Sequence, residues 1–516
     1  MDTSVFRKYD IRGTVEGENA QITPELARSV GQALGTYLPD SFGVKRVFVG
    51  CDNRLTSPAL KAAMIAGLAS TGIAVTDIGA VLTPTVYFAS ASFGAGGAGV
   101  MITGSHLETK YNGIKMAYGP LALAGDQITA LLKIIQSGKF ATGEGEVSTD
   151  FDMIHKHMDT IGKKVSFPRK LRVVLDAGNG LSGTYVYPLL EKLGLEVIGL
   201  YLESDGRYPN HLPNPEDPEM TKDLERAVVE HNADLGLGFD GDSDRCGFID
   251  NYGHHIAADR LLALLAKDVL SRHPGAYVVY DVKGSMALSD FIKKYGGKPV
   301  MWKTGHSLMK QKMHEIGAPI GGEVSGHLFY GDDYYGFDDA PLIALKTLEI
   351  ISKSGQTISE LFEEIPKLHA TPEIIMSAPD DRKFAIVDAL TEAMKAQTDD
   401  VITLDGVRAQ FEGGWGLVRA SNTQPAITMR FEAYTTAQML DYMNRFPRRA
   451  SGSIRRSISP SWTHRSTGSR RCRDRPLPPS SPLPDLRRSR WSSGERGASI
   501  FGGEGSPPAG SLHNTQ

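Results

Sequence analysis

The chain has 516 residues, of which 41% are hydrophobic and 22% charged, and its formal net charge is −4. At roughly 100–200 residues per domain, this predicts a soluble protein of three to four domains. No apolar run is long enough to span a bilayer, and residues 1–12 carry scattered charges in place of an apolar signal segment, so we expect a cytoplasmic protein without a membrane partner. The three cysteines form no CxxC pair, so we expect neither a disulfide framework nor a zinc site.

The first predicted unit alternates β-rich apolar runs with a helix. A strand at 47–49 precedes Cys51-Asp52-Asn53-Arg54, and a helix over 57–70 precedes a strand at 73–75. This order is typical of a βαβ unit. A further strand at 99–102 leads into the loop Thr103-Gly104-Ser105-His106. The glycine-rich run just before that strand has the wrong context for a dinucleotide-binding loop, so we interpret it as a turn.

Two later segments repeat this plan. The second has strands at 173–175 and 195–197 around a helix, and a strand at 235–239 leads into an acid loop, Asp240 to Arg245. The third has strands at 277–280 and near 299–300 around a helix, and a run at 318–320 leads into the loop Gly321 to His327. Ligands of open α/β sheets collect at strand ends, so three polar loops at equivalent places predict one shared cleft.

The last part of the chain follows a different pattern. A fourth segment, about 371–445, carries the loop Arg419 to Pro425 before a strand at 427–431. From Pro447 onward there are 13 arginines, no lysine and many serines and prolines. A basic tail can signal nucleic-acid binding, but the rest of the chain is acidic, so we expect disorder over 447–516 and no nucleic-acid partner. The abrupt loss of lysine is equally typical of a frame-shifted end.

The acid loop is a candidate metal site. Asp240, Asp242 and Asp244 alternate along the chain, and alternate residues of an extended segment point to the same side. Three carboxylates together repel one another unless a cation lies among them, and their hard oxygen atoms suit Mg²⁺. An EF-hand is excluded because Arg245 and Asn251 stand where its glycine and glutamate are needed. The plain alternative is a solvated acidic turn.

Ser105 is a candidate nucleophile or phosphate carrier. It follows a strand, His106 is its neighbour, and Lys115 lies further along. The flanking residues do not fit a GxSxG elbow. Most Ser-His pairs are surface polar residues, so this signal is weak alone. A DxD motif after a strand is also typical of phosphatases with an Asp nucleophile, but those continue with a small residue where this chain has Asp244.

Two other loops have chemistry suited to a phosphosugar. Glu323, Ser325 and His327 alternate between glycines and are suited to hydrogen bonds with sugar hydroxyls. The second loop offers a guanidinium, hydroxyls and backbone N–H groups to a phosphate, from Arg419, Ser421, Asn422 and Thr423. Taken alone, each is more often an ordinary turn.

The loops in this order resemble the α-D-phosphohexomutase superfamily, in particular its bacterial phosphomannomutase/phosphoglucomutase branch, over about residues 5–445. The motifs that carry the resemblance are Phe6 to Gly13, Thr103 to His106 with Asn112 to Lys115, Asp240 to Arg245, Trp302 to Ser307, Gly322 to His327 and Arg419 to Pro425. The chain departs from the family pattern after the serine, where His106-Leu107-Glu108 replaces His-Asn-Pro. Losing the proline makes the loop less rigid.

The resemblance implies three tandem α/β domains with mixed sheets and one repeated core topology, plus a smaller α+β domain, around a central cleft. The expected boundaries are 1–150 for the serine domain, 151–252 for the metal domain, 253–369 for the sugar domain, 370–446 for the phosphate domain and 447–516 for the tail.

The resemblance also implies roles for single residues. Ser105 is similar to the family's phosphoserine, and it joins the three aspartates as a Mg²⁺ ligand. Glu323 and Ser325 are expected at the sugar hydroxyls, and residues 419 and 421–423 at the phosphate that is not transferred. Further cleft positions match Tyr9, Arg12, Lys115, Arg245, Lys283 and His306.

These roles imply a magnesium-dependent isomerase of carbohydrate metabolism. It would interconvert hexose 1-phosphates and 6-phosphates of mannose or glucose through a hexose 1,6-bisphosphate, with His306 or Lys115 as the base and Lys115 and Arg245 offsetting charge. The expected partner is a small phosphosugar, and the expected state is a monomer or weak homo-oligomer. A phosphoglucosamine mutase and an inactive homologue with a binding role are the alternatives.

Overall fold

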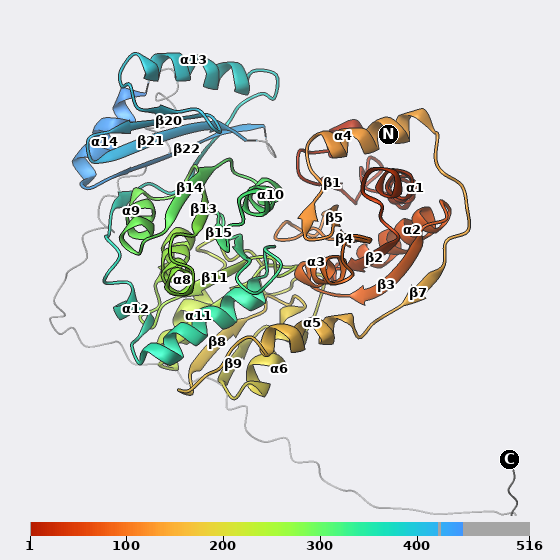
Figure 1. The fold of residues 1–516 in the computed structure, drawn as a ribbon, viewed down its shortest axis with the longest axis horizontal. Helices are drawn as coiled ribbons and strands as arrows, with labels where there is room; N and C mark the ends of the chain where they lie inside the picture. The colour runs from red at the N-terminus through yellow and green to blue at the C-terminus, as the bar shows by residue number, and fades with distance from the viewer. Residues whose placement is uncertain (1, 422–424, 447–516) are drawn as a thin grey trace, which may run out of the picture. The chain divides into compact units, whose positions relative to one another are not determined.

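The computed structural model describes residues 2–421 and 425–446, and these belong to one compact unit. The tail predicted to be disordered, 447–516, lies outside the described residues. Four β-sheets are found in the described part, and they follow one another along the chain (Figure 1). Within the same part, no helix is long and apolar enough to cross a membrane.

The first sheet has the strand order β1-β5-β4-β2-β3-β7, with β6 paired to β5. Its central strand is apolar and buried on both faces, because helices cover both sides. The strands are β1 (Ile11–Thr14), β2 (Arg46–Cys51), β3 (Ala74–Ala80), β4 (Gly97–Ile102), β5 (Tyr111–Tyr118), β6 (Leu121–Ala122) and β7 (Val147–Thr149). The helices are η1 (Thr3–Val5), α1 (Pro24–Phe42), α2 (Ser57–Ala69), α3 (Thr83–Ser92), α4 (Asp126–Ser137) and α5 (Met153–Gly162).

The second sheet has the order β12-β11-β10-β8-β9. Its strands are β8 (Arg172–Asp176), β9 (Glu196–Leu200), β10 (Leu235–Phe239), β11 (Cys246–Ile249) and β12 (His255–Ile256), and its helices are α6 (Ser182–Lys192) and α7 (Lys222–Glu230). The third has the order β14-β13-β15-β16. Its strands are β13 (Tyr277–Asp281), β14 (Lys298–Trp302), β15 (Ile320–Gly322) and β16 (Leu328–Tyr330), and its helices are α8 (Ala258–Arg272), α9 (Met286–Lys294), α10 (His306–Ile316), α11 (Ala340–Ser354) and α12 (Ile358–Leu361).

One four-stranded pattern recurs in these three sheets, as predicted. A central strand pairs in parallel with a strand on each side, and one of those continues into an antiparallel hairpin. The hairpins are β4–β5, β10–β11 and β15–β16. Each hairpin loop therefore occupies an equivalent place in its unit, which puts the Ser105 loop, the acid loop and the Glu323 loop in corresponding positions.

The fourth sheet is antiparallel and has the order β17-β22-β21-β20-β19, with β18 paired to β22. It lies next to the third sheet (Figure 1), where Arg408 donates to the carbonyl oxygens of Val282 and Gly284. Its strands are β17 (His369–Ala370), β18 (Ile374–Ser377), β19 (Val401–Ile402), β20 (Val407–Phe411), β21 (Gly414–Ala420) and β22 (Ala426–Ala433), and its helices are α13 (Lys383–Lys395) and α14 (Thr436–Arg445).

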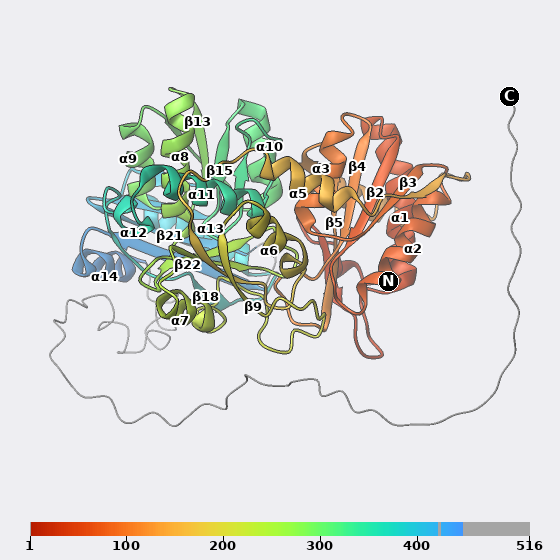
Figure 2. The same cartoon turned by 90° about the horizontal axis from the view of Figure 1, so that it is seen from below.

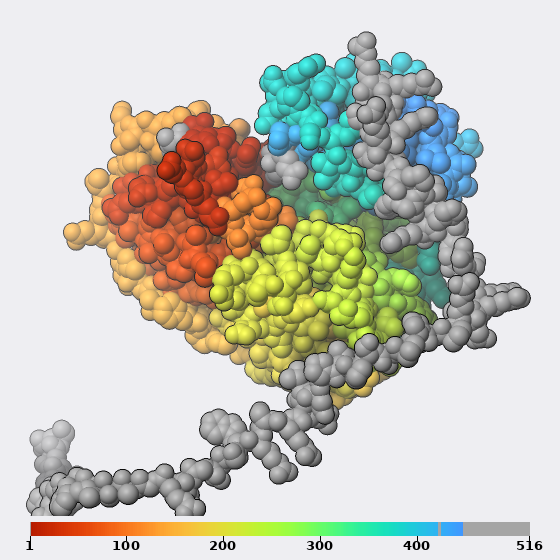
Figure 3. Space-filling view, turned by 180° about the vertical axis from the view of Figure 1, so that it is seen from behind, coloured from red at the N-terminus to blue at the C-terminus, as the bar shows by residue number. Residues whose placement is uncertain are grey.

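A continuous apolar core joins the first three units. The largest buried cluster includes Phe48, Met158, Leu175, Leu262 and Leu345, and Figure 2 shows α3 and α5 side by side within it. The yellow surface of the second unit meets the orange surface of the first in Figure 3. Because a fully buried Leu or Phe contributes about 1.5–3 kcal/mol, this shared core fixes the three hairpin loops relative to one another.

Candidate active site

The polar loops of all four units meet at one cavity of about 560 Å³. This volume suits a small ligand such as a phosphosugar. Most of the residues singled out from the sequence line it: Tyr9, Arg12, Ser105, Lys115, Arg245, His306, Glu323, Ser325, His327, Arg419 and Ser421. The three aspartates of the acid loop are fully buried beside it, with at most 1% exposure.

Ser105 lies at a tight turn that the surrounding side chains hold in place. Its φ of 50° is in the left-handed region, which is costly for a residue with a Cβ. Its N–H donates to Thr103 Oγ1 at 2.8 Å, and the N–H of Gly104 donates to Asp52 Oδ2 at 3.0 Å. These contacts fix the direction of the Ser105 hydroxyl, which is almost fully buried.

Arg54 is a second support of this loop, and no sequence pattern singles it out. The side chain is 1% exposed, and its guanidinium donates to four carbonyl oxygens, those of Ser105, Leu107, Glu108 and Tyr111. Arg54 follows the end of β2, and its contacts with the loop between β4 and β5 form only when the chain is folded. This clamp, formed by the Arg54 guanidinium and the four carbonyl oxygens, restrains the loop that carries Leu107-Glu108.

The departure at Leu107-Glu108 adds an acid to the lining of the cavity. Glu108 is exposed and its carboxylate pairs with Lys110 at 2.5 Å. The extra acid is therefore offset by a neighbouring ammonium group at the mouth of the cavity.

The acid loop brings its carboxylates together by a different geometry from the one predicted. Residues 240–245 form a tight turn between β10 and β11, with Ser243 at φ 58°, so alternation along an extended segment is the wrong reason for their convergence. One oxygen from each of Asp240, Asp242 and Asp244 lies within 4.8 Å of the others. The turn curls the loop so that all three side chains point inward.

These carboxylates fit a divalent cation. Asp242 Oδ1 and Asp244 Oδ1 are buried and have no hydrogen-bond partner within the described residues. Unpaired buried oxygens are costly, and a hard cation such as Mg²⁺ would satisfy them.

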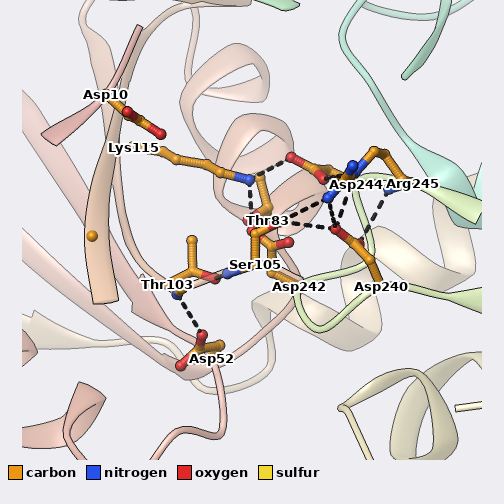
Figure 4. Close-up of polar contacts among 12 residues, drawn as sticks. Asp10, Asp52, Thr83, Thr103, Ser105, Lys115, Asp240, Asp242, Asp244 and Arg245 are labelled. Carbon is orange, nitrogen blue, oxygen red and sulfur yellow. Dashed lines mark hydrogen bonds and ion pairs between the residues drawn. The ribbon is translucent and has the colours of Figure 1, made fainter. Parts of the chain in front are cut away.

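Two basic side chains reach the same cluster (Figure 4). Lys115 Nζ lies 2.7 Å from Asp242 Oδ2 and 2.5 Å from Asp244 Oδ2. Arg245 Nη2 lies 3.1 Å from Asp240 Oδ2 and 3.3 Å from Ser105 Oγ. Ser105 Oγ in turn donates to Asp240 Oδ2 at 2.9 Å. The serine hydroxyl thus lies directly between positive and negative groups.

The same packing shifts the titration of these groups. Burial, with Asp242 and Asp244 close by, raises the pKa of Asp240 to about 8. Burial opposes the charge of Lys115, but Asp242 and Asp244 outweigh it and raise the pKa of Lys115 above its ordinary value. Lys115 is therefore an ammonium group at neutral pH.

The Glu323 loop is also a turn instead of an extended segment. The N–H of Glu323 donates to the His327 carbonyl at 2.8 Å, and Gly326 has φ 87°. The predicted alternation along an extended segment is therefore wrong here too, although the side chains of Glu323, Ser325 and His327 all line the cavity. Burial raises the pKa of Glu323 to about 7, and its carboxylate accepts a hydrogen bond from the N–H of Gly305.

His306 begins α10 beside this loop. Its ring stacks on that of His327 with centroids 5.4 Å apart. Burial and the nearby Lys310 hold the pKa of His306 well below its ordinary value, so the imidazole is neutral. Tyr9 crosses from the first unit and donates to the Thr304 carbonyl at 2.9 Å.

The phosphate-binding candidates of the fourth unit are placed only in part. Arg419 is the penultimate residue of β21, not part of a loop, and its Nε lies 3.0 Å from Asp405 Oδ2. Ser421 follows the strand and lines the cavity, whereas Asn422 and Thr423 lie outside the described residues. Lys283 is absent from the cavity lining among the described residues; its Nζ lies 3.3 Å from Glu373 Oε2.

Comparisons with known proteins agree on one family. The phosphoglucomutase/phosphomannomutase alpha/beta/alpha domains I, II and III match residues 3–142, 153–253 and 257–369, and the C-terminal domain matches 374–448. A phosphomannomutase/phosphoglucomutase of Pseudomonas aeruginosa is 45% identical over 439 residues, which are 85% of this chain and 94% of the relative. A phosphoglucomutase of Neisseria gonorrhoeae is 40% identical over 447 residues, with 86% and 95% covered.

A solved structure agrees with these relatives. The crystal structure of a phosphoglucomutase/phosphomannomutase family protein from Burkholderia thailandensis has a TM-score of 0.81 to this chain at 36% identity, and covers 89% of this chain and 99% of its own.

Proposed function

The chain belongs to the phosphoglucomutase/phosphomannomutase family, as its motifs predicted, and we propose that it interconverts hexose 1-phosphates and hexose 6-phosphates through a phosphorylated Ser105. The proposed substrates are phosphates of glucose, mannose or both. The observation that carries the proposal is the setting of Ser105 Oγ, which lies 2.9 Å from Asp240 Oδ2 and 3.3 Å from Arg245 Nη2 on the wall of the cavity.

The first half-reaction transfers the phosphoryl group to the sugar. A free hydroxyl of the bound hexose phosphate forms a new P–O bond as the bond between phosphorus and Ser105 Oγ breaks. The sugar hydroxyl gives up its proton and Ser105 regains one, so the half-reaction is balanced. Such transfers depend mainly on positioning and on offsetting negative charge, which Lys115 and Arg245 provide here.

Mg²⁺ fits the three aspartates and the phosphate on Ser105. The reason for choosing a hard cation is that one buried oxygen each of Asp242 and Asp244 has no hydrogen-bond partner within the described residues. When bound, the ion supplies a fixed positive charge for the transferring phosphoryl oxygens.

Between the two candidate bases, the pKa values favour His306. His306 lines the cavity together with Ser105, and burial lowers the pKa of its ring, so a neutral imidazole faces the place of the sugar hydroxyl and can accept its proton. Lys115 instead holds its proton, because Asp242 and Asp244 raise its pKa. We therefore assign proton acceptance to His306 and charge neutralisation to Lys115.

The second half-reaction returns a phosphoryl group to Ser105 from the other end of the sugar. The hexose 1,6-bisphosphate turns over in the cavity, and its second phosphate then faces Ser105. The phosphate that is not transferred would be held by Arg419, Ser421, Asn422 and Thr423, with Lys283 nearby. Glu323, Ser325 and His327 would hold sugar hydroxyls in both orientations.

The remaining proposals follow from the same chemistry. We propose hexose 1,6-bisphosphate as the activator, since it can phosphorylate Ser105. We also propose a cytoplasmic monomer or weak homo-oligomer with no nucleic-acid partner. Amino sugar phosphates are a less favoured substrate class, because the relatives described above are named for glucose and mannose phosphates.

Phosphorus NMR of the protein with Mg²⁺, glucose 1,6-bisphosphate and glucose 1-phosphate tests this function. A mutase produces glucose 6-phosphate, and mannose 1-phosphate in place of glucose 1-phosphate gives mannose 6-phosphate. Release of inorganic phosphate instead would identify a phosphatase using an Asp nucleophile. No change in either sugar phosphate would identify an inactive homologue.

A further inference from the structure

Asp338 is a fully buried carboxylate that contacts the two cavity histidines from behind. Its Oδ2 lies 3.0 Å from His327 Nδ1 and 3.8 Å from His306 Nδ1. It comes from the segment between β16 and α11, and neither its spacing nor its neighbours marked it in the sequence. No role in the reaction described above has been assigned to it.

A buried lysine balances the charge of Asp338. Lys310 Nζ, on α10, lies 2.7 Å from Asp338 Oδ1 and 3.9 Å from the ring centroid of Tyr87 on α3. Burial opposes ionisation, but Lys310 and His327 outweigh it and hold the pKa of Asp338 well below its ordinary value. Asp338 is therefore an ionised carboxylate that only accepts hydrogen bonds.

Because Asp338 is ionised and only accepts hydrogen bonds, the ring nitrogen of His327 that faces it must carry a proton. Nδ1 must be the donor to Asp338, so Nε2 is the nitrogen left for the cavity that His327 lines. In a neutral ring, that Nε2 is an acceptor. The ring of His306 stacks on that of His327, so packing against His327 also constrains the orientation of the second ring.

We propose that Asp338 is a positioning residue of the mutase reaction. It fixes the orientation and tautomer of His327, and through ring stacking the orientation of His306, while Lys310 holds its charge in place. The proposal rests on the mutase function proposed above. At metal sites, carboxylates that orient a histidine from behind are a recurring device, and their loss costs about 10- to 100-fold in metal affinity or activity; we take the same magnitude for Asp338.

The alternative is that Asp338 only fills space and supports the fold. Asparagine has nearly the same shape as aspartate, so a structural role predicts that Asp338→Asn is at most less stable, because the buried Lys310 loses its partner, but that the folded fraction keeps full activity. A positioning role predicts that kcat of Asp338→Asn falls about 10- to 100-fold, because the base His306 loses its orientation, and that KM rises by about tenfold or less, because the sugar contact of His327 is weakened. Asp333→Asn, an exposed acid of the same loop, is the matched control and should stay near the parent.

A double-mutant cycle separates these roles. If Asp338 acts through His327, adding Asp338→Asn to His327→Ala should reduce kcat by much less than it does in the parent. Equal losses in both backgrounds would contradict the proposal.

Nitrogen-15 NMR of the histidine-labelled parent, with the His327 signals assigned by His327→Ala, tests the tautomer without any assay of turnover. We expect a protonated Nδ1 on His327 in the parent, and loss of that pattern in Asp338→Asn. An unprotonated Nδ1 in the parent would overturn the inference even if the variants failed to fold. A parent with the expected tautomer but no mutase turnover would instead overturn the proposed function.

Discussion

The two sides of the cavity are built differently. On the side of the first and second units, Ser105 and the acid loop are nearly devoid of solvent exposure, and Arg54, Asp52, Lys115 and Arg245 hold them from several directions. On the side of the third and fourth units, Glu323 and Arg419 are buried, but Ser325 and His327 are partly exposed, and within the described residues Arg419 pairs with Asp405 at the end of its strand. We interpret the first side as fixed for chemistry, and the exposed side chains of the second as contacts for a ligand that is proposed to bind in two orientations.

The largest expected effect is on the fixed side. Ser105→Ala should lower kcat by at least about 1000-fold, because Ser105 is the proposed carrier of the phosphoryl group. The fold should survive, since the substitution removes only one hydroxyl. Steady-state rates and the melting temperature check both points.

Ser325→Ala is the matched change in the equivalent hairpin of the third unit. It should mainly raise KM, by about tenfold or less, because it removes a substrate contact made in both half-reactions. Ser105→Ala turnover within about tenfold of the parent would contradict the contrast between the two sides.

Removal of the metal ion should cause the next-largest loss of turnover. Chelation with EDTA should reduce turnover by about 100-fold or more, since the three aspartates then lack the cation that offsets their charge. Mg²⁺ should restore activity and raise the melting temperature of the protein, because it binds the folded acid loop. An unchanged rate after exhaustive chelation would show that turnover does not need a cation.

Arg54→Lys tests the clamp on the serine loop. One ammonium group cannot replace the fork that reaches four carbonyl oxygens and the nearby Asp52. We expect a loss of about 3 kcal/mol in the free energy of unfolding, together with a lower kcat. Arg46→Lys, which alters the more exposed pair with Glu146, should cost less than about 1 kcal/mol. If urea unfolding shows that Arg54→Lys and Arg46→Lys lower the free energy of unfolding equally, the contacts of Arg54 with the serine loop have no special role in stability.

The last expected effect, at most as large as that of Arg54→Lys, is a pH dependence of stability at Glu323, on the side of the third and fourth units. Burial raises the pKa of Glu323 to about 7 in the folded protein, from an ordinary value of 4.5. The folded state therefore binds more protons than the unfolded state between these values, so this group's contribution to stability falls as the pH rises from about 4.5 to 7.

Glu323→Gln should remove that loss. At pH 8 the variant should gain up to about 3 kcal/mol relative to the parent, compared with the difference at pH 4.5. Urea unfolding at both pH values measures it. A parent and variant with parallel pH profiles would show that Glu323 is not buried as described.

The sequence was sufficient for the repeated hairpins and for most of the cavity lining. The apolar strand runs and the polar loop after each one are local signals, so Ser105, the acid loop and the Glu323 loop could be placed at equivalent positions. The geometry of the turns could not be predicted from the sequence, because an alternating pattern of residues looks the same in a strand and in a loop that curls inward at Ser243 or Gly326. Arg54 and Asp338 act across the fold on residues distant in the chain, so no local pattern marked them.

The most direct test of the central claim is peptide mass spectrometry of the purified protein after incubation with Mg²⁺ and glucose 1,6-bisphosphate. We expect phosphate on the peptide that contains Ser105, and loss of that phosphate when glucose 1-phosphate or mannose 1-phosphate is added in excess. A Ser105 peptide without phosphate, in a preparation that still interconverts the sugar phosphates, would contradict the account.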